Sequence, residues 1–283
     1  MTRIGVSGAT GYLGEEITRV LRENGHVVIE YVRDPVSSSQ RLFAITDAGL
    51  EIGDTDDIEL FIHGAWVLSG KAREAATLNT RATEQLLGAL RKSDTQIIFI
   101  SSMAAFPEAE SWYGRSKLDA ERAVLEGGGI VVRPGTVFGG RNRGIVGAID
   151  KVVRMFHVAP VFGGRNTRLY LVRVERLCAI LNVIARSPSR WTGQGFSIFD
   201  SPQRSLADLY RMLARNANTW VLCINIPAAP CVAILRFCEW IGLRLPLRSD
   251  SIVSITNTNP HSPTCIPDQL ARLVDGESSA VER

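Results

Sequence analysis

The chain has 283 residues, of which 45% are hydrophobic and 22% are charged, and its net charge at pH 7 is +3. This length suits one large or two modest domains, and so small a net charge gives no reason to expect a nucleic-acid partner. Five cysteines without a Cys-x-x-Cys pair argue against a disulfide framework and against a metal site. The chain enters an apolar segment directly after Met1-Thr2, without an export signal, so we expect a cytoplasmic protein.

A glycine-rich turn stands near the start of the chain, between a predicted strand at 3–7 and a predicted helix at 15–24. A second strand follows at 26–32, and this strand, turn, helix, strand order is typical of a dinucleotide-binding fold. The glycine spacing, Gly-x-x-Gly-x-x-Gly, allows backbone amides to approach a pyrophosphate at the start of the helix. A turn without a ligand is the less favoured alternative. We therefore predict that the turn binds the cofactor through Gly8, Thr10, Gly11, Tyr12 and Leu13.

Arg33 follows the second strand, where the choice between NAD and NADP is made. An acidic residue at that position would accept hydrogen bonds from the ribose of NAD, whereas an arginine can hold the extra phosphate of NADP. Asp34 is expected to turn away into the loop. We therefore predict NADP as the cofactor, with NAD possible, and a solvated arginine as the alternative reading of Arg33.

The next segments bring further polar residues to the same edge of the sheet. Residues 35–50 are predicted to form a loop, and an apolar strand at 58–63 ends at His63 and leads to Ala65. Because ligands of open parallel sheets bind at the carboxyl ends of the strands, we expect Ala65 to lie near the cofactor. His63 can be interpreted as a catalytic base or as a residue that holds the backbone in place, and we favour the second interpretation.

A strand predicted at 95–100 follows a long helix predicted at 72–91, and it delivers Ser101-Ser102 to this edge. Tyr113 and Lys117 follow, spaced so that they lie one turn apart on the same face of a helix. A nearby ammonium favours the phenolate and so lowers the pKa of a tyrosine, and such a pair can move a proton to or from a hydroxyl. The tyrosine and lysine spacing alone fits a plain surface helix equally well. The paired serines and the glycine turn favour a catalytic set.

Together these stretches resemble the extended short-chain dehydrogenases/reductases, in the nucleotide-sugar epimerase/dehydratase family. The resemblance implies that Ser102, Tyr113 and Lys117 are catalytic, that Tyr113 and Lys117 also contact the cofactor, and that the segment from Pro134 to Val137 lines the nicotinamide side. The chain departs from the family pattern in lacking the helix expected between Asp54 and Ile58. The matching stretches are Ser7 to Gly14, Ile62 to Ala65, Asn79, Ile100 to Ser102, Tyr113 to Lys117 and Val132 to Gly139.

The fold class expected is α/β, a doubly wound parallel Rossmann sheet with a smaller C-terminal substrate-binding region. Residues 1–140 would form the dinucleotide-binding domain, with 165–187 packing back on it, and 141–283 mainly the substrate-binding region. Arg141 and Arg143 could clamp a substrate diphosphate or belong to a solvated connector. The apolar stretch 220–247 is interrupted by Pro and charged residues, so we expect a helical cap over the substrate rather than a membrane span. Shallow membrane contact is the less favoured alternative.

The function expected is that of an NAD(P)-dependent oxidoreductase or epimerase acting on a secondary alcohol or ketone, with Tyr113 moving the proton. A nucleotide sugar is the favoured substrate and the expected small-molecule partner, and a homodimer is possible. An NADPH-dependent reductase of a small non-sugar ketone is one alternative. A non-catalytic protein that senses a dinucleotide on the same fold is another, because a fold does not determine a function.

Overall fold

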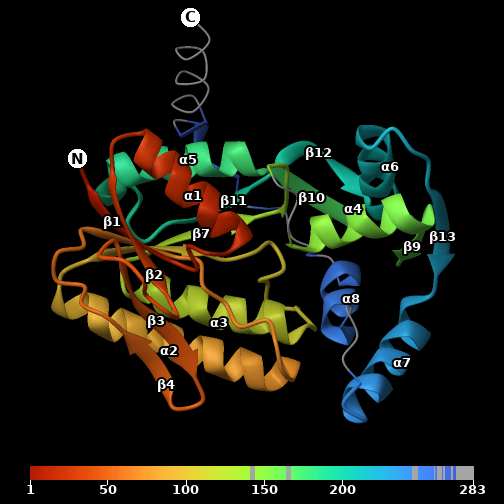
Figure 1. The fold of residues 1–283 in the computed structure, drawn as a ribbon, viewed down its shortest axis with the longest axis horizontal. Coiled ribbons are helices and arrows are strands. Elements are labelled where there is room, and N and C mark those ends of the chain that lie inside the picture. Colours follow the sequence, from red (N-terminus) through yellow and green to blue (C-terminus); the bar gives the residue numbers. More distant parts are fainter. Residues whose placement is uncertain are drawn as a thin grey trace, which may run out of the picture.

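The computed structural model describes residues 1–140, 144–163, 167–243, 248–257, 259, 263, 265–268 and 270–271. Arg141 and Arg143, the candidate diphosphate clamp, lie outside the described residues. Two bodies lie side by side in Figure 1, with the N-terminal half of the chain on the left and most of the later segments on the right.

An eight-stranded sheet forms the first body, in the order β11-β7-β6-β5-β1-β2-β3-β4. Neighbouring strands pair in parallel except at the edge, where β3 and β4 are antiparallel. The order runs outward in both directions from the β1 and β5 pair, which is the switch point where doubly wound sheets bind their ligands. The predicted fold class is thereby confirmed. The strands are β1 Arg3–Ser7, β2 Val27–Val32, β3 Gln40–Thr46, β4 Gly49–Ile52, β5 Leu60–His63, β6 Gln96–Ile100, β7 Ile130–Pro134 and β11 Gly195–Ile198.

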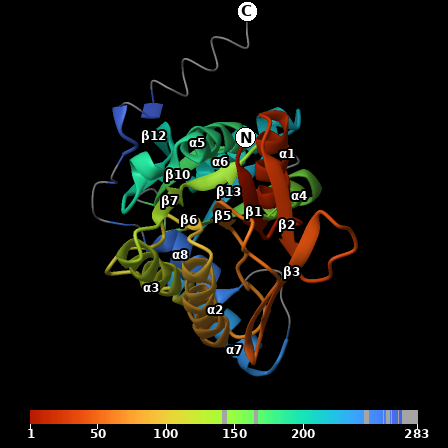
Figure 2. The same cartoon turned by 90° about the vertical axis from the view of Figure 1, so that its left-hand side faces the viewer.

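Two pairs of helices cover the two faces of this sheet, as Figure 2 shows from the side. On one face, α1 (Tyr12–Glu23) packs against α5 (Val174–Arg186), and both contribute to one apolar core. On the other face, α2 (Ala72–Lys92) packs against α3 (Trp112–Glu126) over a second core. Strands covered on both faces are buried along their whole length, and all four residues of β5, Leu60–His63, are buried.

The prediction of a loop at residues 35–50 is wrong. Strand β3 (Gln40–Thr46) pairs in parallel with β2 and turns into β4 (Gly49–Ile52), so the sheet ends in an antiparallel hairpin. The hairpin occupies the part of the chain before Asp54. No helix lies between Asp54 and Ile58, which agrees with the absence of the family's usual helix expected from the sequence.

The second body is built from short sheets and helices that come mostly after residue 135. A three-stranded sheet, in the order β12-β10-β8, and a two-stranded sheet of β13 and β9 carry the third apolar core together with α4 and α6. Helix α6 begins with a capping box of Ser205 and Asp208. The elements are β8 Thr136–Phe138, α4 Gly144–Phe156, β9 Val158–Phe162, β10 Arg168–Arg173, β12 Asp200–Ser205, α6 Leu206–Asn216 and β13 Leu222–Ile226.

The apolar stretch after residue 220 forms β13 and then α7 (Ala228–Trp240), which extends away from the second body in Figure 1. None of the residues of α7 is buried, and the exposed fractions of Phe237 and Trp240 are 58% and 80%. A short helix, α8 (Ser249–Thr256), lies against both α7 and α3. Within the described residues, no helix is long and apolar enough to cross a membrane.

Candidate active site

The glycine turn between β1 and α1 has the geometry of a cradle for a pyrophosphate. Gly8 has a φ of +74°, which other residues rarely adopt, and a side chain on Gly14 would place its Cβ 2.0 Å from the carbonyl oxygen of Gly8. Gly11 is the N-cap of α1 and supplies no side-chain hydrogen bond, so the first amides of the helix face outward without a side-chain cap. Such amides fit an anion, and the turn could therefore hold the diphosphate of a dinucleotide through the backbone of Gly11, Tyr12 and Leu13.

A chain of hydrogen bonds links the strand ends at the switch point, beside this turn. The amide of Ala65 donates to Ser7 Oγ at 3.3 Å, Ser7 Oγ lies 2.8 Å from His63 Nδ1, and His63 Nε2 lies 3.4 Å from Thr83 Oγ1. Because the hydroxyl of Thr83 donates to the carbonyl of Asn79, it can only accept from His63, and we assign the proton of the ring to Nε2. The chain joins the ends of β1 and β5 to α2 and holds Ala65 beside Gly8.

Both ring nitrogens of His63 make hydrogen bonds in this network, so the side chain holds the end of β5 in place. Burial and the neighbouring Lys117 charge lower the pKa of His63 to about 3, so the imidazole is neutral at physiological pH. This agrees with the interpretation favoured from the sequence. Asn79 holds the segment after β5 in place. Its side-chain amide donates to the backbone carbonyl of Val67 at 2.9 Å and accepts from the backbone amide of Val67 at 2.8 Å.

Ser102 is the second residue after β6 and lies between two backbone hydrogen bonds to the end of β7. The amide of Ser101 donates to Val132 at 2.7 Å, and the amide of Met103 donates to Pro134 at 3.1 Å. The structure therefore brings Pro134 beside Ser102, although one is 32 residues after the other. The Ser102 hydroxyl accepts from the amide of Ala104 at 3.1 Å.

Tyr113 is half-buried at the start of α3. The neighbouring Ser101 hydroxyl is buried and has no partner among the described residues. Burial raises the pKa of Tyr113, and the nearby Ser102 side chain opposes that rise. The expectation that this pKa is lowered is not met, because burial has the larger influence.

Lys117 lies one turn further along α3 and points to the end of β6. Its ammonium donates to the carbonyl of Ile100 at 2.7 Å and lies 3.7 Å from the centre of the Trp66 ring and 4.6 Å from that of Phe99. Burial lowers the pKa of Lys117 to about 7, whereas the charge of Glu121 raises it. The two ring faces also favour the ammonium form. Trp66 is a contact of the catalytic set that the sequence gave no reason to single out.

The remaining predicted cofactor contacts lie around the same edge. Val137 is half-buried in β8, and the hydroxyl of Tyr12 donates to the carbonyl of Gly139 at 2.8 Å, which joins the glycine turn to the segment after β8. Burial raises the pKa of Tyr12 to about 12, so this phenol stays protonated and structural. Arg33 is exposed after β2, and within the described residues its guanidinium makes no ion pair. Thr10 is exposed in the glycine turn.

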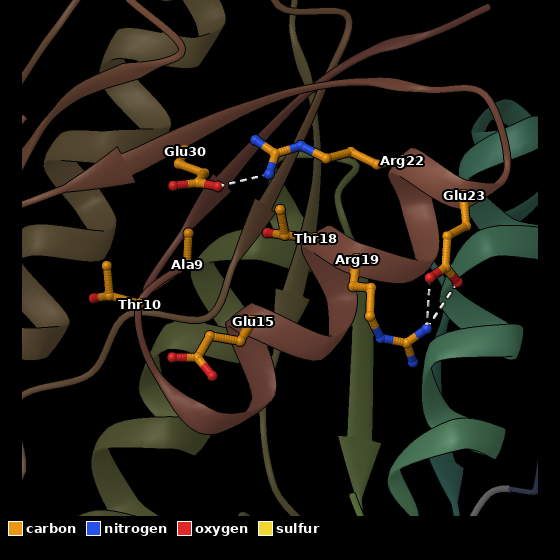
Figure 3. Close-up of a pocket in the computed structure, with 8 residues that line it drawn as sticks. All are labelled: Ala9, Thr10, Glu15, Thr18, Arg19, Arg22, Glu23 and Glu30. Carbon is orange, nitrogen blue, oxygen red and sulfur yellow. Dashed lines mark hydrogen bonds and ion pairs between the residues drawn. The ribbon is translucent and has the colours of Figure 1, made fainter. Parts of the chain in front are cut away.

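A surface cavity of about 500 Å³ opens on the outer side of α1, with Thr10 at its margin (Figure 3). Its arginines are paired within the cavity wall, Arg22 with Glu30 at 2.9 Å and Arg19 with Glu23 at 2.7 Å. None of Ser102, Tyr113 and Lys117 lines it. These three residues belong to the segment after β6 and to α3, apart from this cavity.

The sheet, the glycine cradle and the groups at the strand ends define a dinucleotide-binding protein of the Rossmann type. The model of the NAD-dependent epimerase/dehydratase family matches residues 4–190. The chain belongs to that family, as the motifs in the sequence predicted.

A ceramide reductase from Caulobacter vibrioides (strain NA1000 / CB15N) is 27% identical to this chain over 198 residues, which cover 65% of this chain and 61% of that protein. UDP-N-acetylglucosamine 4-epimerase from Bacillus cereus has a similar structure, with 14% identity, a TM-score of 0.64, and coverage of 90% of this chain and 97% of the other. MoeE5 in complex with UDP-glucuronic acid and NAD is 19% identical, with a TM-score of 0.65 and coverage of 80% and 85%. The structural likenesses show a shared fold.

Proposed function

We propose that the protein catalyses hydride transfer to or from a carbon that carries a hydroxyl or keto oxygen, with Tyr113 moving the proton. The observation that carries the proposal is that the Ser102 side chain lies near enough to the Tyr113 phenol to lower its pKa, while the ammonium of Lys117, one turn along the same helix, donates to the carbonyl at the end of β6. A nicotinamide cofactor, when bound, supplies or accepts the hydride. Ser102 would orient the substrate oxygen, and Lys117 would hold positive charge beside it.

The protonation of these groups favours ketone reduction as the direction of the reaction. Because burial raises the pKa of Tyr113, its phenol carries a proton at neutral pH and can give that proton to a carbonyl oxygen. The carbonyl carbon then receives the hydride and the oxygen receives the Tyr113 proton, so the ketone becomes an alcohol. The reverse reaction needs the phenolate and should become faster as the pH rises.

We propose NADPH as the hydride donor, on the basis of Arg33. Its side chain is exposed at the end of β2, next to the cradle, where the 2′-phosphate of NADP would lie in this class of sheet. NAD is the cofactor that the family description names. The preference for NADP rests on this one guanidinium.

For the substrate we propose a nucleotide sugar, as in the UDP-sugar enzymes that share the fold. The exposed apolar surface of α7 favours a second candidate, a ketone carried on a lipid-like molecule. Helix α7 packs on α8, and α8 packs on the catalytic helix α3, so an apolar chain could follow this surface toward the site. The ceramide reductase from Caulobacter is the relative whose name agrees with this second candidate.

Turnover of NADPH with a panel of ketones, followed at 340 nm, tests the proposal. The panel contains 4-keto nucleotide sugars and 3-keto sphingoid compounds, each with the wild type and with Tyr113→Phe. We expect Tyr113→Phe to reduce turnover by about 10²- to 10⁴-fold while the affinity for the cofactor stays unchanged. Unchanged turnover in this variant would show that Tyr113 does not move the proton, and absence of turnover by the wild type with every ketone would indicate a dinucleotide-binding protein without this chemistry. Nucleotide released from denatured protein separates epimerisation, which retains NAD, from reduction.

A further inference from the structure

A carboxylate from the far end of the chain caps the catalytic helix. Asp250, in α8, accepts hydrogen bonds from the backbone amide of Trp112 at 2.8 Å and from that of Tyr113 at 3.1 Å. These are the first two residues of α3, whose amides have no partner within the helix. Ser111 caps the next amide, that of Gly114, at 3.0 Å. Ser111, just before α3, therefore caps one of these amides. Asp250, which is 137 positions after Tyr113, caps the other two.

The same short helix holds the loops on both sides of the catalytic groups. Asn257, just after α8, accepts from the amide of Glu110 at 2.9 Å. At the other end of α8, the guanidinium of Arg248 donates to the carbonyls of Leu68 and Gly70. Leu68 belongs to the loop that also carries the ring over Lys117. One helix thus links the loop before α2 to the loop before α3.

Helix α8 is in turn fixed to α7. Glu239 accepts from both the amide and the hydroxyl of Ser249, each at 2.8 Å, which caps the start of α8. The contacts run in series from α7 through Glu239 to α8, and from α8 through Asp250 to the amide of the catalytic tyrosine. Glu239 and Asp250 therefore both accept hydrogen bonds from the starts of neighbouring helices.

We propose that Asp250 is a positioning residue for Tyr113, through which the C-terminal region sets the place of the catalytic phenol. The inference rests on the proposed function. The two hydrogen bonds of Asp250 hold the backbone amides of Trp112 and Tyr113, so their loss moves the phenol relative to Ser102 and to the substrate oxygen. A displacement of about 1 Å at a reacting group can reduce a rate by about 10²-fold. The rate, and not the binding of the cofactor, should therefore depend on Asp250.

The test compares Asp250→Ala with Asn257→Ala, a matched variant that removes one contact of the same helix with a backbone amide outside the catalytic set. We expect Asp250→Ala to lower kcat by about 10-fold or more, with KM and cofactor affinity little changed. We also expect the apparent pKa of its rate profile to rise, because a displaced phenol lies further from Ser102, which lowers the pKa of Tyr113. Asn257→Ala should keep the kcat and the pH profile of the wild type.

Asp250→Asn, which retains one acceptor oxygen, should be intermediate and serves if Asp250→Ala does not fold. Wild-type kcat and pH profile in Asp250→Asn and Asp250→Ala would overturn the inference and leave Asp250 a purely structural cap. Equal losses of kcat in Asp250→Ala and Asn257→Ala would overturn it as well. Because Tyr113→Phe tests the chemistry separately, loss of turnover there with none in the Asp250 variants would refute this inference alone.

Discussion

Replacement of Gly14 by alanine tests the cradle that the glycine turn forms. The added Cβ would lie 2.0 Å from the Gly8 carbonyl oxygen, 2.7 Å from the Gly8 carbonyl carbon and 2.8 Å from the Ala9 Cα. All three atoms belong to the backbone, so no side chain can rotate away and the start of α1 must move. We expect a cost at the upper end of the range for overpacking, about 3 kcal/mol.

Alanine also favours the helical state over glycine by about 1 kcal/mol, so the net loss in the free energy of unfolding should be about 2 kcal/mol. Gly88→Ala is the matched control, since Gly88 lies inside α2 and a Cβ there would meet nothing within 4 Å. That variant should gain about 0.5–1 kcal/mol.

Urea unfolding of the two variants and the wild type measures these differences, and NADPH titration measures the cradle. We expect Gly14→Ala to lose at least about tenfold in cofactor affinity, because the amides that face the pyrophosphate move with the helix. A Gly14→Ala protein within about 0.5 kcal/mol of the wild type, with full cofactor affinity, would refute the close packing of turn and helix.

Two further predictions concern charged groups. Because the folded-state pKa of Lys117 is about 7, below the unfolded value of 10.5, the unfolded chain binds more protons between these pH values and the stability contributed by this group rises with pH. Relative to Lys117→Met, the free energy of unfolding of the wild type, measured with urea, should rise from about pH 7 to 9 by at most about 1.4 kcal/mol per pH unit. If the free energies of the two proteins instead change in parallel with pH, Trp66 and the Ile100 carbonyl offset the effect of burial fully. Arg33→Ala should weaken NADPH binding by about tenfold and leave NADH binding unchanged, and equal effects on both cofactors would contradict the phosphate contact.

The sheet and most of its helices could be predicted because their signals are local. Apolar runs that end at small or polar residues mark the strands, and the glycine turn marks the start of α1. Since all parallel strands end at one edge, the residues that follow them, such as Ser102 after β6 and Ala65 after β5, were expected to meet there. Structure and prediction agree at this level.

The hairpin of β3 and β4 was missed because its strands depend on a neighbour. The serine-rich residues 37–39 and the turn before Gly49 suggest a loop, whereas the apolar run from Leu42 to Ile45 is the signal in the sequence that favours a strand. Strand β3 gains its stability from pairing with β2, and β4 at the edge from pairing with β3, and β2 lies outside the sequence of the hairpin.

Apart from the β3–β4 hairpin, the order of the strands and helices of the main sheet, the glycine cradle and the spacing of Tyr113 and Lys117 could be read from the sequence, because each follows from residues close together in the chain. What surrounds those groups follows from tertiary packing: the Ser102 side chain near the phenol, the Trp66 ring over the ammonium, and the Asp250 carboxylate at the start of α3. Such contacts join residues far apart in the chain, and packing rather than local periodicity brings them together. Burial at these positions then sets the pKa of each group, which no spacing of residues encodes.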